Sequence, residues 1–89
     1  MAEVRLDAML RAFGATSRLM SEAGTVGGVL DDLEARYPRL RLKIRDETGA
    51  VRRFVRIFVN GDAIDGAAGL TTPLAPTDRV EVLHSIQGG

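Results

Sequence analysis

The fold of this chain is decided by one stretch, Arg53-Phe54-Val55-Arg56-Ile57-Phe58-Val59-Asn60-Gly61. Its β-branched and aromatic residues alternate with a period of two, which predicts a strand over residues 53–59. The pair Asn60-Gly61 is typical of a two-residue type I′ hairpin turn. Residues 62–65 should therefore fold back as a second, short strand.

A helix is predicted upstream of this strand. Apolar side chains recur there at a spacing of three and four residues, which places them on one helix face: Val26, Val29, Leu30, Leu33 and Tyr37. Thr25 can cap the first turn, and Pro38 ends the run. Gly27 and Gly28 each cost about 1 kcal/mol relative to alanine, so packing must hold this helix more than propensity does.

Strands are also predicted at both ends of the chain. Residues 3–8 alternate between apolar and charged, residues 11–15 look like a turn, and a second strand over 16–22 with Leu19 inward completes a hairpin. Residues 66–78 contain glycine and proline and form a connecting loop. The last strand covers 79–83, with Val80 and Val82 inward.

Leu40, Leu42 and Ile44 alternate with basic residues, which is compatible with a strand or with a short helical turn. Residues 46–49 then form a turn. The order of elements is a hairpin, a helix and further strands. One amphipathic helix covering one face of a mixed sheet of four to five strands is the natural two-layer solution, an α+β β-grasp fold.

Size and composition narrow the function classes. With 89 residues, 45% of them hydrophobic, the chain can close one core, so we expect one domain over residues 1–85 and a flexible tail over 86–89. The absence of cysteine excludes disulfides, thiolate metal sites and a thiol nucleophile. No signal peptide and no apolar run of about 18 residues is present, so we expect a cytoplasmic protein with no membrane partner.

Twelve basic and twelve acidic residues cancel, so no nucleic-acid partner is expected. Seven of the cations nevertheless fall between Arg39 and Arg56, against only Asp46 and Glu47. This segment is either a docking patch for an acidic partner or, as charge runs more often are, a solvated polar face.

No catalytic or metal site is indicated. His84 is the only histidine, and a lone histidine at a strand end is more often a surface or contact residue than a base. Asp31 and Asp32 are adjacent on the predicted helix and cannot converge on one site. No histidine and carboxylate spacing suggests a metal, and no bound cofactor is expected.

The chain ends in Gly88-Gly89. Glycine lacks a Cβ, so such an end can enter a channel too narrow for other residues and present a main-chain carboxylate there. Small residues are also tolerated at frayed termini, which is the plain alternative.

Together these residues resemble a known family. The helix over 25–34, the strand and turn over 53–61, the strand over 78–83 and the terminal Gly88-Gly89 are similar to those of the ubiquitin-like sulfur carrier proteins, the MoaD and ThiS family. Residues 53–60 look most like the CysO-like branch. The approach Leu83-His84-Ser85-Ile86-Gln87 departs from the proline-containing tails common in that family.

The resemblance implies a carrier, and no enzyme in its own right. An E1-like enzyme would use ATP to adenylate the Gly89 carboxylate, which then becomes a thiocarboxylate and donates sulfur in the biosynthesis of cysteine or another sulfur-containing metabolite. Gly88 would make the end of the chain narrow enough to enter an active site. A second, sulfur-accepting biosynthetic enzyme would be the other partner. The free carrier is expected to be a monomer.

A partner-binding surface is expected on the sheet. Alternation turns Phe54, Arg56 and Phe58 to the face opposite the core residues Val55, Ile57 and Val59. Aromatic and arginine side chains are enriched at interface hot spots. Leu83 extends this face toward the tail, where Ile86 and Gln87 would also contact the partner. The alternative is that the loop over 66–78 or the basic segment covers the two rings.

Two other functions stay open: the small subunit of molybdopterin synthase, and a ubiquitin-like protein modifier. A modifier that builds chains offers acceptor lysines, and Lys43 is the only lysine here. That count argues against chains but not against single attachment.

Overall fold

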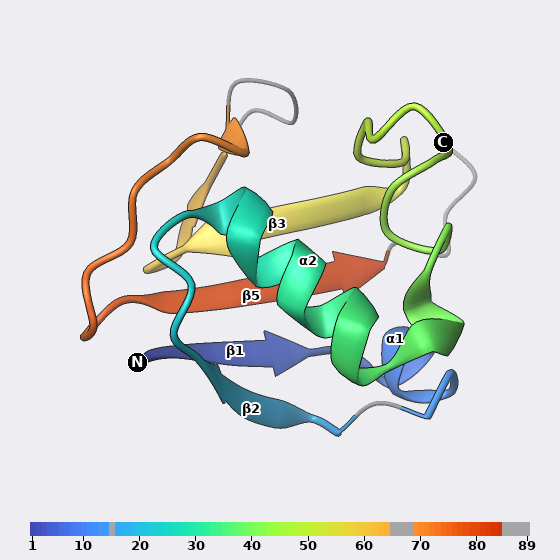
Figure 1. The fold of residues 1–89 in the computed structure, drawn as a ribbon, viewed down its shortest axis with the longest axis horizontal. Coiled ribbons are helices and arrows are strands. Elements are labelled where there is room, and N and C mark those ends of the chain that lie inside the picture. The colour runs from blue at the N-terminus through green and yellow to red at the C-terminus, as the bar shows by residue number, and fades with distance from the viewer. Residues whose placement is uncertain (15, 65–68, 85–89) are drawn as a thin grey trace.

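The protein forms a five-stranded sheet with one main helix across one face (Figure 1). This computed structural model describes residues 1–14, 16–64 and 69–84. The elements in chain order are β1 (Ala2–Leu6), α1 (Ala8–Arg11), β2 (Arg18–Ser21), α2 (Val26–Arg36), the 3-10 helix η1 (Pro38–Leu40), β3 (Val55–Val59), β4 (Asp62–Ala63) and β5 (Arg79–His84). The strand order is β2-β1-β5-β3-β4, with β5 parallel to β1 and the other pairs antiparallel. The expected mixed sheet under one helix, the β-grasp arrangement, is confirmed.

Helix α2 forms as the sequence predicts. The Thr25 side chain accepts a hydrogen bond from Gly28 N at 3.1 Å, so it caps the helix, and Pro38 begins η1 directly after it. The apolar side of α2 packs on the inner face of the sheet, where the core residues are almost fully buried: Val26, Val29, Leu30, Leu33, Val4, Val80 and Val82. A Cβ on Gly27 would lie 3.0 Å from Leu70 O, so glycine permits a close approach of the loop to this helix.

The prediction of a strand over 3–8 was wrong at its end. β1 stops at Leu6, and the Asp7 side chain caps α1 by accepting a hydrogen bond from Leu10 N at 3.1 Å. Leu10 is thereby turned into the core. The expected turn over 11–15 is therefore preceded by a helical turn, while Leu19 on the shorter β2 lies inward as predicted.

Residues 40–45 take the helical alternative. η1 and a following turn bury Leu40 and Ile44, whereas Leu42 is exposed and has a positive φ of 65°. Arg45 anchors this segment to α2, with its guanidinium 2.7 Å from Asp31 and 3.0 Å from Glu34. The alternating pattern of residues 40–45 thus reflects two buried side chains, Leu40 and Ile44, in η1 and the following turn rather than in a strand.

The Asn60-Gly61 hairpin is confirmed. Both residues have positive φ, 53° and 87°, as a type I′ turn requires, and Val59 pairs with Asp62 across it. β4 covers two of the four residues predicted, and Ile64 N continues the pairing by donating to Ile57 O at 3.0 Å. Asp65 and the first part of the predicted loop lie outside the described residues.

Candidate functional site

The last described residue, His84, is the root from which residues 85–89 continue. β5 lies in the middle of the sheet, so this root is held from both sides: Val82 pairs with Leu6 of β1, and His84 pairs with Val55 of β3. Central strands anchor a chain more firmly than edge strands because both rows of backbone groups are bonded. The sheet therefore presents the tail from a fixed point.

Asp7 clamps this root, a contact that sequence reasoning missed. Its Oδ2 accepts a hydrogen bond from His84 N at 2.6 Å, while its Oδ1 caps α1. Asp7 N in turn donates to Val82 O at 3.4 Å. One carboxylate thus joins the start of α1 to the end of β5, and an aspartate directly before a buried helical turn was the signal available.

The His84 ring lies half-buried, and its Nδ1 is buried without a hydrogen-bond partner among the described residues. The structure thus places His84 as a contact residue at the strand end, one of the two environments expected for it. Nothing in the described part of the chain pairs the ring with a catalytic carboxylate.

The open face of the sheet carries three of the residues predicted to bind a partner. Arg56 on β3 pairs with Leu83 on β5, and Phe58 pairs with Glu81, so these four side chains form one group beside the tail root. Arg56 is exposed, and Phe58 and Leu83 are half-buried. The structure therefore brings three of the predicted residues together on a surface that solvent reaches.

Phe54 differs from the expectation. It lies in the turn before β3, which begins at Val55, and the Arg53 guanidinium sits over its ring at 5.5 Å from the centroid. The period-two alternation therefore does not extend to it. The remaining predicted site residues, Ile86, Gln87, Gly88 and Gly89, lie outside the described residues.

A hollow of about 370 Å³ adjoins Leu83 on the same face. Arg5, Arg11 and Arg18 line it together with Asp7 and Glu81. Glu3, next to this hollow, binds Arg5 at 2.7 Å and Arg18 at 3.1 Å. The hydrogen bond from Arg5 lowers the pKa of the Glu3 carboxyl, so the group stays ionised.

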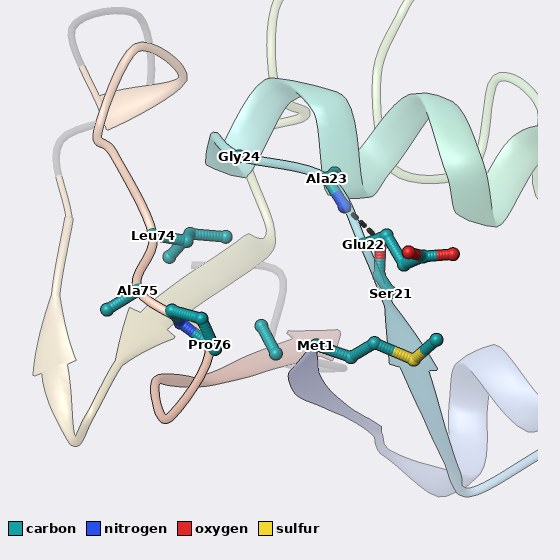
Figure 2. A pocket seen from close by; sticks show the side chains of 9 residues that line it. Met1, Ser21, Glu22, Ala23, Gly24, Leu74, Ala75 and Pro76 are labelled. Carbon is teal, nitrogen blue, oxygen red and sulfur yellow. Dashed lines mark hydrogen bonds between the residues drawn. The ribbon is translucent and has the colours of Figure 1, made fainter.

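A second hollow, of about 160 Å³, lies at the opposite end of the sheet. Figure 2 shows it between Met1, the end of β2 and the segment at Leu74 to Pro76. Ser21 and Glu22 are polar residues of its lining. The Ser21 Oγ accepts from Ala23 N at 3.2 Å and donates to Asp32 at 2.7 Å, so both of its bonds are internal to the fold, whereas Glu22 is exposed.

Metal and membrane features were also sought. Within residues 1–14, 16–64 and 69–84, no group of three or more His, Asp or Glu could hold a metal ion. None of the described helices is long and apolar enough to cross a membrane.

Comparison with known proteins decides the family. The family model described as "ThiS family" matches residues 4–89. The chain belongs to the ThiS family. The sulfur carrier protein CysO of Mycobacterium tuberculosis is 34% identical over 89 residues, which cover 97% of this chain and 96% of that protein.

Solved structures agree with this ThiS-family fold. The crystal structure of M. tuberculosis CysO has a TM-score of 0.83 at 30% identity and covers 97% of this chain and 100% of that one. The small archaeal modifier protein 1 of Methanosarcina acetivorans has a TM-score of 0.81 at 32% identity, with 99% and 95% covered. CysO of Amycolatopsis orientalis, solved in a complex with BexX, has a TM-score of 0.85 over 100% of both chains, and at 23% identity it supports the fold alone.

Proposed function

We propose that this chain is a sulfur carrier that accepts, holds and delivers sulfur on the carboxylate of Gly89. The observation that carries this proposal is the ThiS-family match over residues 4–89, joined by 34% identity to a sulfur carrier along nearly the whole of both chains. The fold supports it, because a central strand clamped by Asp7 holds the root of the tail.

The chemistry requires activation first. An α-carboxyl group has a pKa of about 3.5, so it is ionised at neutral pH and resists attack by a sulfur nucleophile. An E1-like enzyme would join the Gly89 carboxylate to AMP from ATP, with release of pyrophosphate. Sulfide then displaces AMP and leaves the thiocarboxylate; a persulfide donor also displaces AMP but needs a further thiol to cleave its S–S bond.

The carrier acts as a co-substrate of two enzymes, as group carriers do. Arg56, Phe58 and Leu83 would dock the body on the partner, while Ile86 and Gln87 line the approach and Gly88 lets the chain enter a narrow channel. The thiocarboxylate then delivers sulfur to an electrophile in the second, biosynthetic enzyme. These steps would take place in the cytoplasm.

Intact mass spectrometry tests this function. The full chain is incubated with ATP, sulfide and the E1-like enzyme encoded in the same genome, and its mass should rise by one oxygen-to-sulfur exchange. A variant lacking Gly89 should show no rise. An unchanged mass, with an enzyme that thiocarboxylates another carrier, would contradict the proposal.

A second function, protein modification, is favoured by the similarity to the archaeal modifier protein. In that case Gly89 would form isopeptide bonds with lysines of target proteins. Conjugates that survive denaturant and thiol reagents, and disappear when Gly89 is deleted, would establish it. Stable copurification with a larger subunit would point instead to molybdopterin synthase.

A further inference from the structure

We infer that the basic side chains around the root of the tail form a docking surface for an acidic surface on the enzyme that receives the tail. The inference rests on the proposed function, because it needs a partner that takes up the chain end. It assigns the cations over residues 39–56 to recognition.

The first support is that most of these cations lack an acidic partner. Arg45 is compensated, because Asp31 and Glu34 both bind it and, despite its burial, raise the pKa of its guanidinium. The other six are exposed and form no salt bridge with any described residue: Arg39, Arg41, Lys43, Arg52, Arg53 and Arg56.

The nearby acids offset these cations only in part. The hydrogen bond from the Thr48 hydroxyl and, to a smaller extent, the charge of Arg52 lower the pKa of the Asp46 carboxyl. Asp46 is occupied within its own loop, where Oδ1 accepts from Thr48 N at 2.9 Å and from Ala50 N at 3.2 Å. Glu47 is the only other acid in the segment. Glu34 lines the same hollow as Arg41 but binds Arg45, and Glu81 pairs with Phe58 in the strand register next to Arg56, so these two acids offset the charge only in part. The six exposed cations therefore leave a positive excess in this region.

The second support is position. Val55 pairs with His84, so Arg52 and Arg53 lie beside the point where the chain leaves β5. Figure 1 shows the loop over 41–52 at the same end of the molecule as the carboxyl end of β5. The excess charge therefore borders the tail root.

The third support is that acidic residues gather at the other end of the sheet. Glu22 follows β2, Asp62 begins β4 and Asp78 precedes β5, and these strand ends all lie opposite the tail root. Arg79 at the start of β5 offsets part of this negative charge, and the cations over residues 39–56 leave the tail end the more positive of the two. Such a difference orients an approaching partner of negative charge toward the tail end.

An acidic protein fits this surface better than nucleic acid does. Arg56 lies beside Phe58 and Leu83, so the charges adjoin half-buried apolar side chains of the kind found at protein interfaces. Two of the cations also rest on aromatic rings, Lys43 over Phe13 at 4.9 Å and Arg53 over Phe54 at 5.5 Å. These contacts hold the two cations in place on the surface.

The test measures association of the full chain with the E1-like enzyme by stopped-flow fluorescence. Measurements at ionic strengths of about 0.01 M and about 1 M compare weak and strong screening, since the Debye length falls from about 30 Å to about 3 Å. Arg53→Glu and Arg41→Glu should each slow association about tenfold at low salt, and the difference should vanish at high salt. Arg79→Glu, the same charge change at the far end of β5, should alter the rate less than about twofold.

Equal effects of Arg53→Glu and Arg79→Glu would overturn the inference, as would Arg53→Glu and Arg41→Glu variants that lose binding to duplex DNA while their association with the enzyme is unchanged. Circular dichroism confirms that each variant is folded. A chain lacking Gly89 separates this surface from the sulfur chemistry, because it should keep salt-dependent association without forming a thiocarboxylate. If these charge changes leave the association rate unchanged and the thiocarboxylate still forms, the docking surface is rejected and the proposed function stands.

Discussion

At the scale of single residues, Asp7 has the largest local consequence. One carboxylate caps α1 and also binds the backbone of His84, so it couples the start of a helix to the root of the tail. An N-cap aspartate contributes about 1 kcal/mol, and a buried N–H left without its acceptor costs a similar amount.

Asp7→Ala should therefore lower the free energy of unfolding by about 2 kcal/mol. It should also speed hydrogen exchange at the His84 amide, because that donor loses its acceptor. Urea unfolding and exchange measured by NMR check both effects. Asp7→Asn is the control: it keeps one acceptor oxygen and should lose less, and equal behaviour of both variants would argue against the clamp.

Substitutions at Phe58 and at its neighbour Ile57 test docking and stability separately. Phe58 is half-buried on the open face, whereas Ile57 is only 4% exposed in the core. Phe58→Ala should weaken association with the activating enzyme by about 2 kcal/mol and leave the domain folded. Ile57→Ala should lower the free energy of unfolding by about 2–5 kcal/mol. If Phe58→Ala unfolds the domain as severely as Ile57→Ala, Phe58 belongs to the core.

At the scale of elements, the β3–β4 hairpin depends on its turn more than on its strand contacts. β4 has only two residues, and the turn needs positive φ at both Asn60 and Gly61. No atom lies within 4 Å of a Cβ built on Gly61, so a side chain there would meet backbone strain and no steric clash.

Gly61→Ala should accordingly lower the free energy of unfolding by about 1 kcal/mol. Gly24→Ala is a matched control, because that position is equally open and has no positive φ. Chemical denaturation of both variants checks the difference. Equal stability of the two would mean that the hairpin turn can adopt another conformation.

At the scale of the whole molecule, the Asp78 carboxylate joins two separate segments at the end of the sheet opposite His84. Asp78 accepts hydrogen bonds from Ala75 N at 2.8 Å and from the Asn60 side chain at 3.0 Å, so it links the loop before β5 to the β3–β4 hairpin. These bonds, led by the one from Ala75, lower the pKa of Asp78 from its usual 3.8.

The pKa of Asp78 is lower in the folded state than in the unfolded state. These bonds therefore stabilise the folded state fully at a pH above the pKa of the unfolded state, and this stabilisation is lost as the pH falls through the pKa of the folded state. The melting temperature of the native chain should therefore decline below about pH 4. Asp78→Asn cannot ionise and should flatten that decline. If the decline at low pH is unchanged in this variant, it comes from other carboxylates such as Asp46, whose pKa is also lowered, chiefly by the hydrogen bond from the Thr48 hydroxyl.

Local patterns predicted the elements that carry strong periodic or turn signals. The spacing of Val26 to Leu33, the cap at Thr25 and the positive-φ pair Asn60-Gly61 act over a few residues, so a reader of the sequence can find them. Signals failed where a distant contact outweighed them. Asp7 continued a period-two pattern but became a helix cap. Leu42 also continued one but is exposed, with positive φ, in the turn after η1.

By itself, the sequence determined the two-layer class, the inward faces of the main strands, the diglycine end and the family resemblance, since these depend on residue order and side-chain chemistry. Strand pairing and loop packing, by contrast, established that Asp7 holds His84, that Arg56 and Phe58 lie beside Leu83, and that six exposed cations near the tail root form no salt bridge with a described residue. The physical reason is that each depends on strand register and on pairing between residues far apart in the chain. Composition fixes the total charge at zero, whereas the fold places the loop over 41–52 at the end of the molecule where β5 ends.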